Sequence, residues 1–230
     1  MTLASCDSRK TAGENPFFTE WDTPHGVPPF DKILPEHFMP AFERGMSLHE
    51  AEIDAITSNK DEATFENTIL AYDDAGQMLA QTELVFGMLC AAETNDRMQA
   101  LQEQAMPLLA AHRDKIRLDD KLFVRVKEVY DRRAALGLDA EQMRLLQKTY
   151  DSFVRAGALL DAEQKARLKE INGQLSLTAV KFGNNILAEN NNFVLELKSD
   201  ELDGLPAGIR DAAREKARQM GKGDKWVFTL

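Results

Sequence analysis

The chain has 230 residues, 43% of them hydrophobic, which suffices for one large or two small globular domains with a buried core. Acidic residues outnumber basic ones, 38 to 28, for a net charge of −10. A nucleic-acid backbone would repel such a surface on average, so nucleic acid is excluded as the expected partner. No apolar run approaches the about eighteen residues that a membrane helix needs, so no transmembrane segment is expected.

The first residues resemble a bacterial lipoprotein signal. Leu3-Ala4-Ser5-Cys6 has the pattern of a lipobox, in which the signal peptide is cut before the cysteine and the cysteine is lipidated. Residues 1–14 then form a polar tether, although no charged start or apolar signal core is visible before Leu3. We expect lipidation at Cys6 and a periplasmic or cell-envelope lipoprotein. The alternative is a chance tetrapeptide in a cytoplasmic protein.

The segment from Asn15 to Ile33 is expected to be a docked, extended arm. It is rich in proline, which lacks an amide donor and restricts the residue before it. Its aromatic side chains should hold it across the body of the domain: Phe17, Phe18, Trp21 and Phe30.

Two long helices are predicted next, over residues 35–57 and 64–90. Pro35 suits a first helical turn, and Thr64 is a plausible cap. Apolar residues recur at steps of three and four along both helices, as on a buried face. Gly76, inside the second helix, indicates either the close approach of another helix or a weak point.

Further helices are predicted over residues 95–116, 121–136 and 208–220. Pro107 should kink or break the first of them. Two more helices should begin at capping boxes, in which an aspartate is followed three residues later by a glutamine. These boxes are Asp139 with Gln142 and Asp161 with Gln164.

The helix that begins at Asp161 should end in the asparagine cluster of residues 190–192. It carries an apolar stripe on one face: Leu168, Ile171, Leu175, Phe182 and Ile186. The period then changes to that of short strands, over residues 193–197 and 226–230. We therefore predict a mainly α fold of long antiparallel helices with a short β pair near the carboxyl end. Because the chain stops in a strand-like run, Leu230 is expected to be an engineered or proteolytic boundary.

A self-contained catalytic site is not found. His49-Glu50-Ala51-Glu52-Ile53 is a near miss of the zinc motif His-Glu-x-x-His, because Ile53 has no lone pair for a metal. No two histidines are three or four residues apart. We therefore predict no catalytic residue and no metal ligand, interpret His49 as a surface or interhelix histidine, and leave the substrate-binding residues unassigned. Cys90 is interpreted as a buried structural thiol.

Several stretches do more than follow a helical period. They resemble the start of the bacterial peptidyl-dipeptidases, which belong to the thimet-oligopeptidase family of zinc metallopeptidases. The resemblance runs from about Asn15 to Leu230. The segments that carry it are Asn15-Pro16-Phe17-Phe18, Pro28-Pro29-Phe30-Asp31-Lys32-Ile33, residues 37–46, Glu52-Ile53-Asp54-Ala55-Ile56, Thr64-Phe65-Glu66-Asn67-Thr68-Ile69, Leu145-Leu146, residues 153–158, residues 165–172 and Gly204-Leu205-Pro206.

The resemblance implies that residues 15–230 are the amino-terminal helical domain of a larger peptidase, truncated before its catalytic zinc domain. It implies zinc in the parent enzyme and none in this chain, because the family's zinc ligands and general base lie beyond Leu230. It further implies one wall of a channel that admits short peptides, from which the parent releases carboxyl-terminal dipeptides. The pair His37-Phe38, and Phe65 where the oligopeptidase branch has tryptophan, favour the peptidyl-dipeptidase branch. The alternative is a non-catalytic helical module that binds a peptide or a partner.

Overall fold

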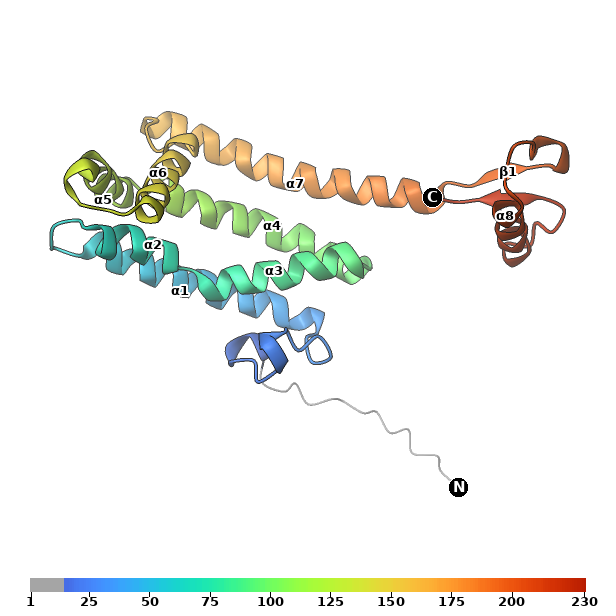
Figure 1. The fold of residues 1–230 in the computed structure, drawn as a ribbon, viewed down its shortest axis with the longest axis horizontal. Coiled ribbons are helices and arrows are strands. Elements are labelled where there is room, and N and C mark those ends of the chain that lie inside the picture. The colour runs from blue at the N-terminus through green and yellow to red at the C-terminus, as the bar shows by residue number, and fades with distance from the viewer. Residues whose placement is uncertain (1–14) are drawn as a thin grey trace, which may run out of the picture. The chain divides into compact units, whose positions relative to one another are not determined.

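The computed structural model describes residues 15–230 (Figure 1). The chain divides into two units, Met1–Leu177 and Thr178–Leu230. The predicted mainly α fold with a short pair of strands is confirmed.

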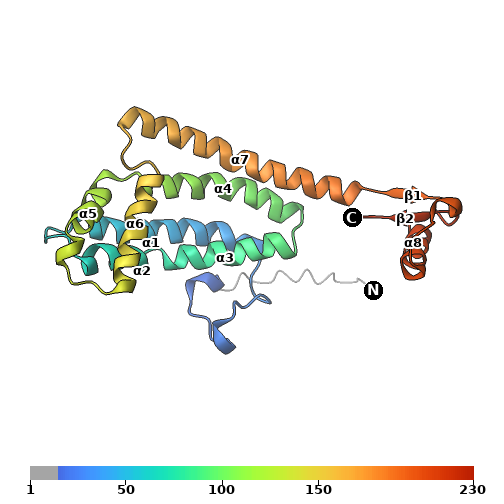
Figure 2. The same ribbon diagram turned by 45° about the horizontal axis from the view of Figure 1, so that its top comes forward.

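The first unit is built from helices. They are α1 (Phe38–Ser58), α2 (Ala71–Asp74), α3 (Gln77–Ala92), α4 (Asp96–Arg117), α5 (Asp120–Asp131) and α6 (Ala140–Arg155). The helices α1, α3 and α4 pack on one another lengthwise, and α5 packs against α6 and α1 (Figure 2). The helix α7 (Ala162–Asn192) begins in this unit and contains the unit boundary. It ends at the asparagine cluster, as predicted.

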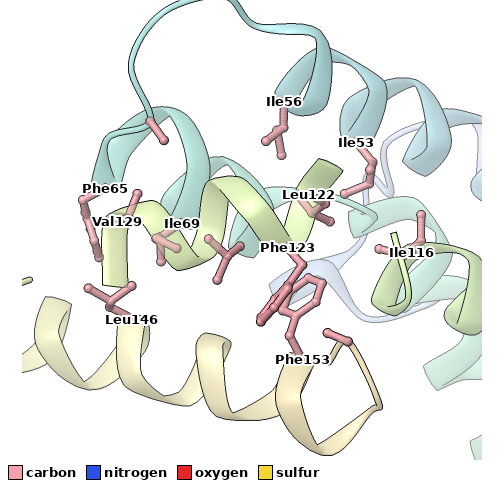
Figure 3. Packing of buried hydrophobic residues seen from close by; sticks show 13 residues of the cluster. Ile53, Ile56, Phe65, Ile69, Ile116, Leu122, Phe123, Val129, Leu146 and Phe153 are labelled. Carbon is pink, nitrogen blue, oxygen red and sulfur yellow. The ribbon is translucent and has the colours of Figure 1, made fainter. Parts of the chain in front are cut away.

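Two hydrophobic cores stabilise the first unit. The first core joins the arm to α1, α3 and α4 through aromatic rings, with the Phe38 and Phe86 centroids 4.9 Å apart. The second core lies where α1, α5 and α6 meet the segment after Thr64, and its side chains converge in Figure 3. Phe123 and Phe153 lie within it, with ring centroids 6.1 Å apart. Both cores consist of buried apolar side chains contributed by several helices, which holds these helices together.

The arm follows the prediction in part. Phe17 is buried in the first core, and Trp21 donates from Nε1 to the carbonyl oxygen of Pro16 at 2.8 Å. Short 3₁₀ turns form at Pro16–Phe18 and Pro24–Gly26, where proline fits the first position. Phe30 was expected to be an anchor, but it is exposed, and the arm is instead held by Phe17 at its beginning and by Ile33 at its end, which are both buried in the first core.

The predicted second long helix is not continuous. Thr64 caps its start as expected, since Oγ1 accepts from the amide of Asn67. The chain then forms a π-helical segment, Phe65–Leu70, continues as α2 and bends at Ala75 and Gly76 before α3 begins. Gly76 has a φ of 77°, a left-handed conformation that suits glycine.

A kink or a break was expected at Pro107, and the break does not form, since α4 runs without interruption from Asp96 to Arg117. Ala105 and Leu109, on either side of the proline, are both buried in the first core. Their packing outweighs the local cost of about 3 kcal/mol for a proline inside a helix. Both predicted capping boxes are confirmed. In each box the aspartate side chain accepts a hydrogen bond from the backbone amide of the glutamine three residues later, and the glutamine side chain accepts one from the backbone amide of the aspartate.

The second unit contains β1 (Leu195–Leu197), α8 (Ala207–Gln219) and β2 (Trp226–Phe228). The strands are antiparallel, with Leu195 opposite Phe228. The helix α8 packs against β2, and the guanidinium of Arg214 lies 4.6 Å from the Trp226 ring centroid. Val227 of β2 is buried, as are Ala213 and Ala217 of α8.

Candidate functional site

The near-miss zinc segment places its two ends in different environments. His49 on α1 faces α4, where its Nδ1 lies 3.1 Å from Nε2 of His112. Ile53 is only 4% exposed and belongs to the second core. The interpretation of His49 as an interhelix histidine is confirmed. The segment therefore makes a polar contact at His49 and an apolar contact at Ile53.

A network of charges surrounds this histidine pair. Nδ1 of His112 lies 3.5 Å from Oε1 of Glu50, and Oε2 of Glu50 lies 2.7 Å from Nζ of Lys115. Arg113 of α4 also donates a hydrogen bond to Oε2 of Glu83 on α3 at 2.9 Å. Glu50 and Glu83 therefore each have a cationic partner on α4.

Burial lowers the pKa of both imidazoles below the ordinary value of histidine. For His49 the neighbouring imidazole of His112 lowers the pKa further, while for His112 the Glu50 carboxylate opposes the effect of burial. The hydrogen bond from Lys115 lowers the pKa of Glu50. The pair is therefore neutral at neutral pH, and one facing nitrogen donates to the lone pair of the other.

Next to the pair lies a cavity of about 220 Å³ between α1, α4 and the bend before α3. Tyr72, Arg113 and Arg117 add polar groups to its lining. Burial raises the pKa of the Tyr72 hydroxyl, and Arg117 opposes that rise. Within the described chain the lining contains no serine, threonine or cysteine, so the cavity offers space for a small polar molecule and no hydroxyl or thiol nucleophile of those types.

The zinc that the family resemblance implies does not fit the described residues. Among residues 15–230, no three histidine, cysteine, aspartate or glutamate side chains come together as metal ligands would. The two imidazoles that do meet face each other at hydrogen-bonding distance, and Ile53 replaces the second histidine of the motif. We derive no catalytic step through a metal in this chain.

A larger groove of about 780 Å³ runs between the arm and α3. Phe18, Trp21 and Met78 line it, together with Leu84, whose residue surface is 66% exposed. The guanidinium of Arg44 lies 4.5 Å from the Phe18 ring centroid. This groove is open, and its lining combines aromatic and aliphatic side chains from the arm and from α3.

The most characteristic segment of the resemblance, Thr64 to Ile69, has a structural role. Asn67 accepts at Oδ1 from the amide of Thr64 and from Nη2 of Arg125, and it donates from Nδ2 to the carbonyl oxygen of Glu62. Phe65 and Ile69 are buried in the second core. The segment therefore organises a turn and a core rather than a ligand site.

Of the two cysteines, only Cys90 lies within the described residues. Cys90 is half-buried beside the first core, and burial raises the pKa of its thiol, as in a structural cysteine. Cys6, the expected lipidation site, lies outside the described residues. No helix in residues 15–230 has the length and hydrophobicity to cross a membrane.

The histidine pair was not anticipated from the sequence. Its members are 63 residues apart, and a search for histidines three or four residues apart cannot find them. They meet only because the register between α1 and α4 brings them together. No local pattern in the sequence carries that information.

No family model matches the chain, but it is similar in sequence to known peptidases. It is 38% identical to the dipeptidyl carboxypeptidase of Escherichia coli over 94% of this chain and 32% of that protein. Identity to the dipeptidyl carboxypeptidase of Salmonella typhimurium is 36% over the same shares. Oligopeptidase A of Escherichia coli is 24% identical over 85% of this chain and 29% of its own length.

The chain therefore spans about a third of the length of the curated relatives it matches. The identity to the dipeptidyl carboxypeptidases exceeds that to oligopeptidase A, in agreement with the branch that the sequence favoured. The family resemblance found in the sequence is confirmed. The chain is related over nearly its whole length to the dipeptidyl carboxypeptidases and, more distantly, to the oligopeptidases.

Proposed function

We propose that this chain is the amino-terminal helical domain of a zinc-dependent dipeptidyl carboxypeptidase. The observation that carries the proposal is the 38% identity to the dipeptidyl carboxypeptidase of Escherichia coli over 94% of the chain. The zinc and its ligands are proposed to lie in the rest of the polypeptide, because the described residues do not fit a metal site. The substrates are proposed to be short peptides, from which the whole protein releases carboxyl-terminal dipeptides.

In this proposal the chain forms one wall of the substrate channel, centred on the segment from Thr64 to Cys90. Such a wall must keep its shape while peptides pass, and two features support that. Two aromatic-rich cores hold α1, α3, α4, α5 and α6 in place. Gly45 of α1 also approaches α3 so closely that a Cβ there would lie 3.0 Å from the Cα of Leu79.

Exposed apolar side chains on α7 support a role within a larger protein. Leu175 and Phe182, both on the predicted stripe, are 62% and 65% exposed, and Ile171 and Ile186 are exposed too. Apolar side chains repeated at helical spacing are usually covered by another part of the protein. The relatives are about three times as long as the matched region, so their additional polypeptide can supply that cover.

The second candidate function is a non-catalytic module that binds a peptide or a partner protein. The groove between the arm and α3 favours it, because an open groove with aromatic walls suits an apolar peptide segment. Binding of a labelled short peptide by this chain, lost on Trp21→Ala and Leu84→Glu, would support the module. It would not require any hydrolysis.

The exopeptidase proposal is tested on the full-length protein with a matched pair of peptides, one with a free carboxyl end and one with a carboxyl-terminal amide. An enzyme that cleaves two residues before the carboxyl end of a peptide must bind the negative charge of the terminal carboxylate. We expect release of a dipeptide from the free acid and at least about a hundredfold slower release from the amide, a loss of about 2.7 kcal/mol of transition-state binding. Equal cleavage of both at internal bonds would assign the protein to the oligopeptidase type.

We also propose lipidation of Cys6 and a location in the cell envelope. The support is the sequence Leu3-Ala4-Ser5-Cys6 ahead of a polar tether. One acyl chain binds membranes only marginally, so stable anchoring needs more than one chain on this cysteine. A cytoplasmic protein in which this tetrapeptide occurs by chance is the alternative.

A further inference from the structure

The His49–His112 pair lies where three parts of the first unit meet: α1, α4 and the bend between α2 and α3. A Cβ added to Gly76 would lie 2.9 Å from Nδ1 of His49, so the ring packs directly on the bend. One turn along α1, Glu52 accepts the amide of Gly76 at Oε2, at 2.7 Å. His49 and Glu52 of α1 therefore both contact the bend, and His112 of α4 contacts His49.

The hydrogen bond between the imidazoles tolerates one extra proton but not two. At 3.1 Å, Nδ1 of His49 and Nε2 of His112 need one N–H and one lone pair between them. The neutral pair meets this requirement, and so does the pair with one added proton. When both rings are protonated, two N–H groups point at each other and the contact becomes repulsive.

The surrounding charges do not remove this repulsion. Those that face the pair come from α1 (Glu50 and Glu52), from α3 (Glu83) and from α4 (Arg113, Lys115 and Arg117), with the Tyr72 hydroxyl on the cavity wall. Each of the three carboxylates is already engaged: Glu50 by Lys115, Glu52 by the Gly76 amide and Glu83 by Arg113. A second proton on the pair therefore meets partly neutralised acids and nearby cations.

We propose that the His49–His112 pair is a proton-sensitive latch, closed at neutral pH, whose opening on acidification loosens the bend between α2 and α3 while the two cores stay folded. The burial of His112, which is 5% exposed, makes the second protonation costly and keeps the latch closed until the solution is distinctly acidic. The device stands on the described contacts alone and is independent of the proposed peptidase activity.

Amide hydrogen exchange of the ¹⁵N-labelled 230-residue chain tests the latch, with the imidazole resonances followed in the same samples. The range from about pH 7.5 to about pH 5 spans the titration of histidine and lies above that of ordinary carboxylates. We expect the protection factor of the Gly76 amide to fall by at least about tenfold as the second imidazole titrates. The protection of Leu122 and Phe153, in the second core, should stay constant.

The matched variants are His49→Gln and His112→Gln, in which the side chain can still hydrogen-bond but takes up no proton. Both should remove the pH dependence at Gly76. His25→Asn changes an exposed histidine with a φ of 60° and should retain it. A constant Gly76 protection factor while both imidazoles titrate in the unmodified chain would overturn the proposal, even if a variant failed to fold. An undiminished pH dependence in His49→Gln would overturn it as well.

Discussion

Arg125 of α5 donates from Nη2 to Oδ1 of Asn67 at 3.1 Å, although the two residues are 58 positions apart. The same guanidinium donates from Nη1 to the carbonyl oxygens of Asn59 and Asp61. One buried side chain thus fixes the loop after α1 and the capped start of the π-helical segment. The segment from Thr64 to Ile69, which is the most characteristic part of the resemblance, is therefore held in part by a residue that is distant in sequence.

Replacing Arg125 by methionine should lower the free energy of unfolding by about 2–4 kcal/mol, because three backbone or amide oxygens lose a charged donor in a buried site. Urea unfolding, followed by the near-ultraviolet signal of the stacked rings of Tyr130 and Tyr150, measures the change. Lys127→Met on the same helix is the control. The ion pair of Lys127 with Asp131 is exposed and contributes little to the free energy of unfolding, so the urea midpoint of this variant should hardly change. Equal shifts in both variants would refute the role given to Arg125.

Gly76→Ala should destabilise the chain by more than Gly137→Ala. Both glycines have positive φ, 77° and 64°, which costs an alanine about 1–2 kcal/mol. A Cβ at Gly137 meets nothing within 4 Å, whereas one at Gly76 would displace the ring of His49. The excess, expected to be at least about 1 kcal/mol, should shrink when His49→Ala is combined with Gly76→Ala. An excess that survives in the double variant would show that His49 is not its cause.

Stability should fall as the pH drops below about 6.5, the ordinary pKa of histidine. The folded-state pKa of both His49 and His112 is lowered, so below 6.5 the unfolded chain binds protons that the folded chain does not. The contribution is complete above about 6.5 and is lost as the pH falls toward the folded-state values. Urea midpoints at about pH 7.5 and pH 5.5 should differ less in the double variant His49→Gln/His112→Gln. Identical pH dependence with and without the two histidines would contradict this assignment.

Lipidation is expected to depend on Cys6. Cells that produce the full-length protein with its native leader, labelled with a palmitate analogue, should show labelled protein in the membrane fraction. Cys6→Ser should abolish that label, and Cys90→Ser should not, because the Cys90 thiol is half-buried. Equal labelling of the protein and its Cys6→Ser variant, or a wholly cytosolic pool, would count against export.

Local sequence rules predicted the ends of helices well. Thr64, Asp139 and Asp161 cap their helices because each supplies an acceptor within reach of an amide three residues on. The helical start near Pro35 and the two short strands could also be predicted from the residues within each segment.

What the sequence did not predict depends on packing between elements. The role of Gly76 was ambiguous because the contacts that His49 and Glu52 of α1 make with it join residues that are distant in sequence. Pro107 was overrated as a breaker because the buried residues on either side hold α4 together. The His49–His112 contact follows from the register of two helices, which one sequence does not encode in any short window.

The central claim is that this chain contributes structure, and not the catalytic centre, to a zinc peptidase. Metal analysis after dialysis, combined with a fluorogenic assay of dipeptide release, tests it on the full-length protein and on the 230-residue chain in parallel. The account predicts stoichiometric zinc and chelator-sensitive turnover in the full-length protein, with neither in the 230-residue chain. Stoichiometric zinc and chelator-sensitive turnover in the 230-residue chain would contradict it.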